Sequence, residues 1–237
     1  MVRTQKPQRV VDLGCGTGEL TAVLHRELGA AETIGVDSSP AMLAKAVELD
    51  VPGLRFSRAD IAEWTPSEPL DVVFSNAALH WLPDHPRLFA RLAAMLAPGG
   101  QIAVQVPANF DHPSHTAAAA LAQEEPFATE LGGYVRESPV LAPELYAELL
   151  HALGFGAQHV RLQVYGHELA SVDDVVEWVR GSLLTDYEAR MSEAGFTRFF
   201  NLYRERLRTS LGPATPYFYA FKRILLCGRR GSLPHKP

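Results

Sequence analysis

The sequence has few cysteines, no long apolar run and no excess of basic residues, and each absence excludes a class of protein. Its two cysteines, Cys15 and Cys227, lack the paired spacings of a disulfide framework or a zinc site, so no metal is expected. No apolar run approaches the roughly 20 residues that cross a bilayer, and residues 1–6 are too polar for a signal peptide. The formal net charge of -5 gives no field that attracts nucleic acid or anionic lipid. We therefore expect a cytoplasmic protein without nucleic-acid or membrane partners, and no pattern indicates its oligomeric state.

The chain has enough apolar residues for one sizeable α/β domain. Its 237 residues are 47% hydrophobic, and the length falls within the usual range for a single domain. Between residues 9 and 107, short apolar runs alternate with amphipathic stretches, which predicts βα units and a Rossmann-like, mostly parallel sheet with helices on both faces. The expected strands are residues 9–13, 33–36, 54–57, 70–74, 101–106, 158–164 and 217–228.

Helical patterns dominate the rest of the chain. In the first helix, periodicity places Leu20, Val23, Leu24 and Leu28 on one face. Because no repeat or linker divides the chain, we expect residues 1–237 to form a single domain with helical cap insertions. The predicted core comprises residues 9–107, 143–166 and 217–228, and the predicted cap and substrate insertions are 108–142 and 167–216.

A glycine-rich loop follows the first predicted strand. Gly14, Gly16 and Gly18 stand between a buried strand and a helix that begins near Glu19. Glycines at this place let the backbone turn tightly and approach a ligand, and the free N–H groups of the helix point towards it. A tight turn without a ligand also uses glycine, so the loop alone is a weak signal.

Acidic residues follow the next two predicted strands. Asp37 ends the second strand, where a carboxylate accepts hydrogen bonds from a ribose diol. Asp60 follows the third strand beside Ile61 and is placed to accept from an adenine amino group, although a helix cap explains Asp60 nearly as well. Open α/β sheets bind ligands at this edge, so the set predicts a nucleoside-containing ligand.

The spacing of the glycines separates two nucleoside cofactors. Gly14-x-Gly16-x-Gly18 differs from the G-x-G-x-x-G pattern that holds a dinucleotide pyrophosphate. S-adenosylmethionine has no phosphate, and an acid such as Asp12 suits its ammonium group. The sequence therefore favours S-adenosyl-L-methionine, with a nicotinamide dinucleotide as the alternative.

Longer motifs carry a family resemblance. Four segments, residues 11–18, 37–42, 59–61 and 75–81, resemble class I S-adenosylmethionine-dependent methyltransferases. Within this superfamily, residues 75–85 and 103–115 are most similar to the trans-aconitate methyltransferase family. The resemblance implies a seven-stranded sheet with an antiparallel last strand. The cofactor-binding residues that we expect from the loop and the resemblance are Asp12, Gly14, Cys15, Gly16, Gly18, Asp37, Ser38, Met42, Asp60, Ile61, Asn76 and Ala77.

One departure from this superfamily lies at the start of the chain. Its members carry a segment before the first strand that covers the cofactor with aromatic residues, whereas here the first strand begins almost at once. We expect either that the cover is lost or that the start is truncated.

The resemblance implies an O-methyltransferase that esterifies a carboxylate of a small acid such as trans-aconitate. A carboxylate, with a pKa of about 4, is already deprotonated and needs no general base. His80 is the candidate catalytic residue, and acceptor positioning, a base role and packing all remain open for it. A polycarboxylate needs cations, for which Arg136, Arg180 and Arg223 are candidates. The substrate-binding residues we expect are Trp81, Phe110, Arg136, Tyr146, Arg180 and Tyr217.

Three other functions remain open at this point. The chain can methylate another small metabolite, it can bind the cofactor without turnover, or it can be a nicotinamide-dependent dehydrogenase. A scan of acceptors tests for another metabolite, and calorimetry tests for cofactor binding without turnover. Binding of a nicotinamide cofactor tests for the dehydrogenase.

Overall fold

The computed structural model describes residues 2 and 4–231, and these divide into two compact units. The first unit comprises residues 1–107, 139–163 and 223–237, and the second comprises 108–138 and 164–222, so far as these lie within the described residues. We expected one domain with insertions at 108–142 and 167–216. The second unit begins at the expected residue 108, but its other bounds lie a few residues away from those expected. The reason is that two long strands, β6 (Phe155–Leu169) and β7 (Tyr217–Arg230), contribute residues to both units.

Within the described residues, seven strands form one sheet in the order β3-β2-β1-β4-β5-β7-β6. Strands β1 to β5 are parallel to one another, whereas β7 pairs antiparallel with β5, as the resemblance implies. All the expected strands are present, and β5 and β6 are longer than expected. The first five strands are β1 (Arg9–Leu13), β2 (Glu32–Asp37), β3 (Leu54–Arg58), β4 (Leu70–Asn76) and β5 (Leu96–Pro107).

Strand β5 begins at Leu96, earlier than the expected residue 101. Leu96 pairs with Leu70 of β4, and the register shifts before Gln101 pairs with Val72. Gly99, at a φ of 78°, lies in this irregular stretch. The turn-forming residues therefore make a bulge inside the strand rather than a loop before it.

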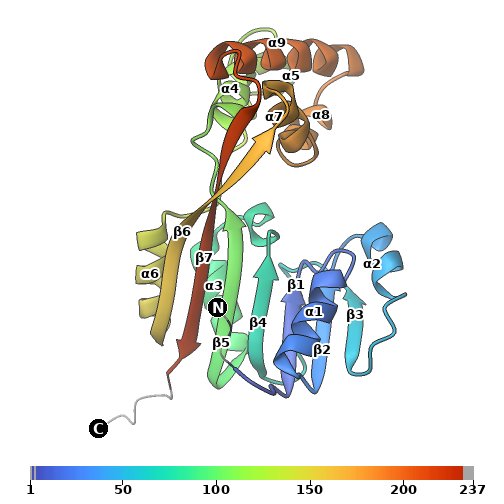
Figure 1. Cartoon of the computed structure of the whole chain (residues 1–237), viewed down its shortest axis with the longest axis vertical. Helices are drawn as coiled ribbons and strands as arrows, with labels where there is room; N and C mark the ends of the chain where they lie inside the picture. Colours follow the sequence, from blue (N-terminus) through green and yellow to red (C-terminus); the bar gives the residue numbers. More distant parts are fainter. Residues whose placement is uncertain (1, 3, 232–237) are drawn as a thin grey trace. The chain divides into compact units, whose positions relative to one another are not determined.

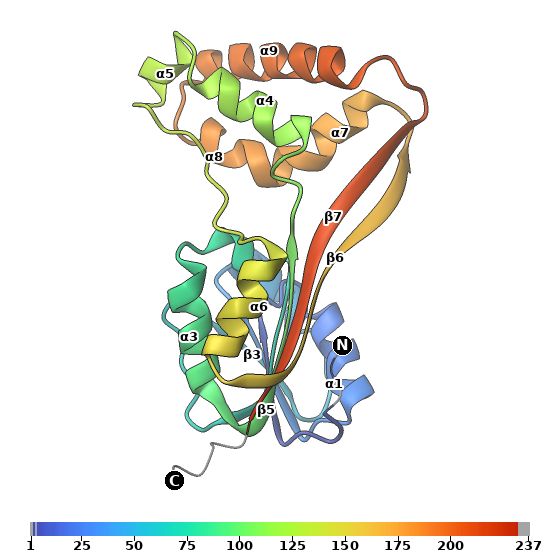
Figure 2. The same ribbon diagram turned by 90° about the vertical axis from the view of Figure 1, so that its left-hand side faces the viewer.

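Helices cover both faces of the sheet in the first unit. Figure 2 shows α3 and α6 on one face and α1 on the opposite face. The core between them is formed by apolar strand residues such as Val11, Val73 and Val104, which are at most 1% exposed. The helices of this unit are α1 (Glu19–Leu28), α2 (Pro40–Ala46), the 3-10 helix η1 (Leu79–Trp81), α3 (His85–Met95) and α6 (Pro143–Ala152) (Figure 1).

The predicted packing face of α1 is wrong. Leu20 and Val23 are 44% and 45% exposed, and the helix instead buries Thr21, Ala22 and His25. Thr21 donates a hydrogen bond to Asp12, and the His25 ring bonds to the hydroxyl of Thr33. Polar partners on the neighbouring strands thus orient the helix, a choice that apolar periodicity does not reveal.

The second unit is helical and has its own core. Phe127, Tyr187, Phe199 and Tyr203 lie in this core and are at most 1% exposed. Helix α9 packs against α4 and α7. Among the described residues, none of the helices in either unit combines the length and apolar character needed to cross a membrane. The helices are α4 (Pro113–Ala122), α5 (Phe127–Glu130), α7 (Val172–Val179), the π-helix η2 (Arg180–Leu184), α8 (Thr185–Glu188) and α9 (Glu193–Leu211).

Candidate active site

The loop between β1 and α1 uses its three glycines for different reasons. Gly14, Gly16 and Gly18 all have positive φ, at 80°, 56° and 77°. A Cβ on Gly14 would lie 2.1 Å from the Cβ of Ala78, and one on Gly18 would lie 2.6 Å from the ring of Phe56. A Cβ on Gly16 would meet nothing within 4 Å. Two glycines thus allow neighbouring segments to pack closely, and only Gly16 leaves open space.

This open space belongs to a cavity of about 450 Å³ in the first unit. The cavity lies at the carboxyl ends of the parallel strands, where open α/β sheets bind their ligands. Nine of the residues predicted to contact cofactor or substrate line it, together with Ser39, Ala78 and Leu82. The nine are Gly14, Gly16, Asp37, Ser38, Met42, Asp60, Ile61, Ala77 and Trp81.

Asp37 connects two of the loops that line the cavity. Its Oδ2 accepts a hydrogen bond of 2.9 Å from the backbone N–H of Gly16, and its Oδ1 accepts one of 2.8 Å from that of Ser39. A carboxylate offers about four lone-pair sites, so both oxygens keep capacity for further donors. The residue therefore fixes the glycine loop and still offers acceptors for a ribose diol.

Replacing Asp37 with alanine is expected to weaken binding of S-adenosylhomocysteine by about 1 to 3 kcal/mol. The substitution removes the proposed ribose acceptor and leaves the Gly16 N–H without its carboxylate. Calorimetric titration measures the affinity, and Asp37→Asn, which keeps one acceptor oxygen, should give an intermediate loss. An unchanged affinity in Asp37→Ala would contradict the ribose assignment.

The sequence left two roles open for Asp60, a cap and a ligand contact, and the structure is compatible with both. Its Oδ1 accepts a hydrogen bond of 2.8 Å from the N–H of Ala62, so the side chain caps the turn that follows β3. The residue also lines the cavity. The cap orients the carboxylate rather than excluding it from ligand binding.

Arg91 holds the same turn, although the sequence alone does not indicate this role. Its guanidinium donates to the carbonyl oxygens of Trp64, at 2.8 Å, and Ile61, and burial lowers its pKa. Ile61 is one of the cavity-lining residues. An arginine on the amphipathic helix α3 looks like a surface residue in the sequence, and its partners lie about 30 residues away, so no local signal identifies it.

Four predicted cofactor residues are not among those that line the cavity: Asp12, Cys15, Gly18 and Asn76. Asp12 is 2% exposed and accepts a 2.6 Å hydrogen bond from Thr21. Its pKa is raised from 3.8 to about 6, mainly by burial and to a smaller extent by the charge of Asp37, while the Thr21 hydrogen bond opposes the shift. Cys15 packs its side chain against Leu43 and Ala46, and burial raises the pKa of its thiol to about 12. The Cys15 thiol therefore belongs to the core.

The loop after β4 contains η1 and brings Ala77 and Trp81 to the cavity. Ala77 has a φ of 55°, an uncommon conformation for a residue with a Cβ, and its N–H donates to the carbonyl oxygen of Gln105. His80 is 9% exposed, and its ring lies 5.1 Å from that of Trp81. His80 does not line the cavity, so the geometry favours its packing role over that of a base.

Tyr146 is a predicted substrate residue that the structure places in the core. It is fully buried, its hydroxyl donates to Nδ1 of His85, and the same hydroxyl accepts from the N–H of Leu141. The other ring nitrogen of His85 donates to the carbonyl oxygen of Leu79 in η1. Tyr146 therefore serves the packing of α6 on α3, and this burial gives little support to its predicted contact with a substrate.

The remaining predicted substrate residues belong to the second unit. Phe110 packs edge-on against His115, and the Tyr217 hydroxyl lies 3.3 Å from Nε2 of His112. Arg180 is exposed and lies 3.6 Å from Glu177. Whether these side chains contact a substrate stays a prediction.

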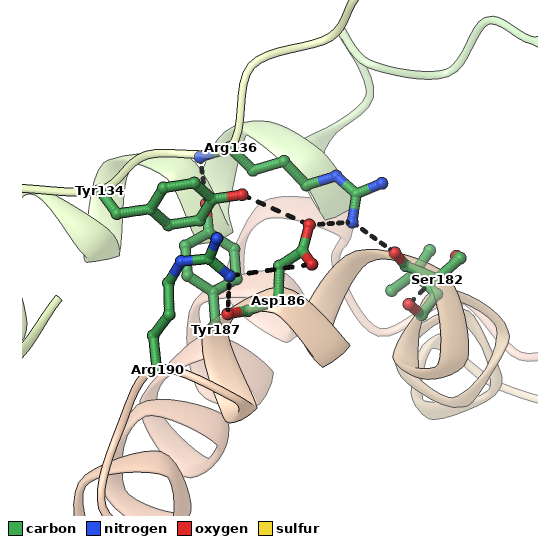
Figure 3. A network of polar contacts seen from close by, with 7 residues as sticks. Tyr134, Arg136, Ser182, Asp186, Tyr187 and Arg190 are labelled. Atoms are coloured by element: carbon green, nitrogen blue, oxygen red, sulfur yellow. Dashed lines mark hydrogen bonds and ion pairs between the residues drawn. The ribbon is translucent and has the colours of Figure 1, made fainter. Parts of the chain in front are cut away.

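Arg136 is held by internal partners (Figure 3). Its Nη1 donates to the carbonyl oxygen of Ser182 at 2.6 Å and lies 3.0 Å from the carboxylate of Asp186, which also accepts from the Tyr134 hydroxyl. The side chain of Arg136 is only 12% exposed. Its guanidinium thus stabilises the second unit, and this geometry gives little support to a role in binding an acidic substrate.

The fold and the cavity together define a Rossmann-like methyltransferase. Strand order, the antiparallel β7 and the cavity at the carboxyl edge agree with the fold that the resemblance implies. A family model described as "Methyltransferase domain" matches residues 2–160. The chain therefore belongs to this methyltransferase family. Membership confirms the predicted class, an S-adenosylmethionine-dependent methyltransferase, and decides against the dehydrogenase.

Individual relatives extend this similarity along nearly the whole chain. A trans-aconitate 2-methyltransferase of Deinococcus radiodurans is 47% identical over 95% of this chain and 88% of its own length. A trans-aconitate 2-methyltransferase of Mycobacterium tuberculosis is 38% identical over 97% of this chain and 88% of its own. In structure, the YcgJ protein of Bacillus subtilis matches with a TM-score of 0.61 at 20% identity, covering 97% of this chain and 94% of its own.

Proposed function

We propose that this enzyme methylates a carboxylate of a small polycarboxylic acid, with trans-aconitate as the first candidate. The observation that carries the proposal is the 47% identity, over 95% of the chain, to a relative named trans-aconitate 2-methyltransferase. In this proposal the enzyme acts on a dissolved cytoplasmic acid without nucleic acid or membrane, in keeping with the net charge of -5.

The chemistry of the residues that line the cavity supports it as the site for S-adenosylmethionine. Gly16 leaves space where any other residue would place a Cβ, and the Asp37 carboxylate keeps acceptor capacity for a ribose. Ile61 and Met42 offer apolar walls for an adenine ring, with Asp60 beside them. These residues would hold the cofactor.

When bound, S-adenosylmethionine supplies an electrophilic methyl group, so that an O–C bond forms as the S–C bond breaks and the electron pair stays on sulfur. The protein must then align the acceptor and exclude water. A carboxylate acceptor is already ionised at neutral pH and needs no proton removed. The burial of His80 outside the cavity lining is consistent with a reaction that uses no general base.

An acceptor scan tests the proposal. Purified protein with labelled cofactor should transfer methyl groups to trans-aconitate, and less to monocarboxylic acids, phenols and amines. Asp37→Ala serves as a site control and, because it weakens cofactor binding, should lower transfer to every acceptor by a similar factor at limiting cofactor. Transfer to a phenol or amine with none to any polycarboxylate would refute the proposed acceptor class, and cofactor binding without transfer to any acceptor would refute the proposed activity.

A further inference from the structure

Strand β7 brings Arg223 to the end of the sheet where the parallel strands have their carboxyl ends and where the cavity lies. Because β7 is antiparallel to β5, Arg223 pairs with Pro107, the last residue of β5. The carboxyl ends of β4 and β5 lie at this same edge, where the N–H of Ala77 donates to the carbonyl oxygen of Gln105. Neighbouring strands are about 4.8 Å apart, so β7 lies about 10 Å from β4.

Arg223 shares one face of the sheet with Asn76 and Gln105. Asn76 pairs with Gln105, and Gln105 pairs with Leu225, so these three side chains lie on the same face. Arg223 is two residues before Leu225 on the strand and therefore projects to that face as well. The register thus lines up polar side chains from three adjacent strands beside the loop that carries Ala77.

Gln105 and Arg223 form a pair that is rich in hydrogen-bond donors. The Nη1 of Arg223 lies 3.4 Å from Oε1 of Gln105, an uncharged oxygen. Gln105 is 8% exposed, and its buried Nε2 has no hydrogen-bond partner among the described residues. Buried polar groups nearly always have partners, and an unsatisfied donor beside a cation calls for an acceptor that carries negative charge.

The other two candidate arginines are used differently. Arg136 pairs with the carboxylate of Asp186, and Arg180 is exposed near that of Glu177. Both belong to the second unit, whereas Arg223 lies in the first unit with the cavity. Position therefore separates Arg223 from the arginines that the sequence favoured.

We propose that Arg223 and Gln105 bind a carboxylate of the methyl acceptor that is not itself methylated. The guanidinium provides a planar fork that matches a carboxylate, and the carboxamide of Gln105 adds its N–H donors. Anchoring one carboxylate here would present another to the cofactor cavity. This assignment rests on the proposed function and adds the residues that select an acid with more than one carboxylate.

Kinetics of Arg223→Gln test the assignment. The substitution should raise the KM for trans-aconitate about 10- to 100-fold, as expected for loss of a charged hydrogen bond, and leave the affinity for S-adenosylhomocysteine unchanged. Arg229→Gln is the matched control because Arg229 is exposed on the same strand, where its Nε donates to the carbonyl oxygen of Gly99. Arg223→Lys, which keeps the charge without the fork, should recover part of the affinity.

Selectivity provides a readout that general damage would not change. Wild type should prefer trans-aconitate to its partly esterified monoacid, and Arg223→Gln should lose most of this preference. Gln105→Glu is a second variant, in case Arg223→Gln does not fold. It keeps the size of the side chain but repels an incoming carboxylate, so the KM should also rise.

The outcomes distinguish the two proposals. Absence of methyl transfer to any polycarboxylate by wild type refutes the proposed function. If wild type methylates trans-aconitate and both Arg223→Gln and Gln105→Glu keep its KM and selectivity, the role of this pair is refuted. A raised KM with unchanged cofactor affinity supports it.

Discussion

Replacing Gly14 with alanine is expected to destabilise the protein by about 2 to 5 kcal/mol. The new Cβ would lie 2.1 Å from the Cβ of Ala78, and neither methyl group can rotate away. The backbone φ of 80° adds the strain of a left-handed conformation. Urea denaturation measures the loss in free energy of unfolding.

Gly16→Ala is the matched comparison. Its φ of 56° carries similar strain, but the new Cβ meets nothing within 4 Å. We expect a loss of only about 1 to 2 kcal/mol in stability, together with weaker binding of S-adenosylhomocysteine because the methyl group enters the cavity. Gly14 should thus behave as a packing residue and Gly16 as a ligand-binding one.

A double substitution separates the two contributions at Gly14. Ala78→Gly removes the opposing methyl group, so in the Ala78→Gly background Gly14→Ala should cost only the backbone strain. Equal destabilisation by Gly14→Ala in both backgrounds would show that contact with Ala78 is not the cause.

The second large effect is a dependence of stability on pH through Asp12. Burial raises the pKa of Asp12 from 3.8 to about 6, so the folded state holds a proton that the unfolded state releases. The contribution of Asp12 is fully favourable below pH 3.8 and is lost as the pH rises through 6. At about 1.36 kcal/mol per pKa unit, the loss amounts to about 3 kcal/mol.

Asp12→Asn tests this linkage because asparagine keeps an oxygen that can accept from Thr21 and carries no charge. Urea denaturation between about pH 4 and pH 8 should show a smaller fall in stability for Asp12→Asn than for wild type. Asp50→Asn, at an exposed position, is the control and should follow wild type. Parallel curves for Asp12→Asn and wild type would contradict the assignment.

The same residue links pH to cofactor binding. If Asp12 faces the ammonium group of the cofactor, as the sequence predicts, binding favours the charged carboxylate and releases a proton. The affinity for S-adenosylhomocysteine should then rise as the pH increases through about 6, and this rise should disappear in Asp12→Asn. A pH-independent affinity would place the ammonium elsewhere.

Much of the fold and part of the site could be predicted because their signals are local. Short apolar runs separated by turn residues indicated the strands, and the turn chemistry of Gly14, Gly16 and Gly18 placed the loop at the end of β1. Acids at the ends of β2 and β3 face one edge because parallel strands end together, so Asp37 and Asp60 were predicted to line a common cavity. These features depend on neighbours in the chain and on general sheet geometry.

The sequence was least informative where the position of a side chain depends on a hydrogen-bond partner that is distant in the chain. Leu20 and Val23 looked like the buried face of α1, but Thr21 and His25 turn that helix through bonds to Asp12 and Thr33. The hydroxyl of Tyr146, an expected substrate residue, is likewise engaged by a distant partner, His85, 61 residues away. Apolar periodicity and residue type carry no information about such partners.

By itself, then, the sequence determined the Rossmann-like sheet, the methyltransferase class and the loops that line the cavity, since each follows from a short continuous motif. Only the tertiary structure decided what the individual polar residues do. It engaged Arg136 with Asp186, placed Arg91 on the turn after β3, and set Arg223 of β7 beside Gln105 of β5. The physical reason is that charge and hydrogen-bond capacity are properties of a residue, whereas the partner that uses them is fixed by strand register and helix packing.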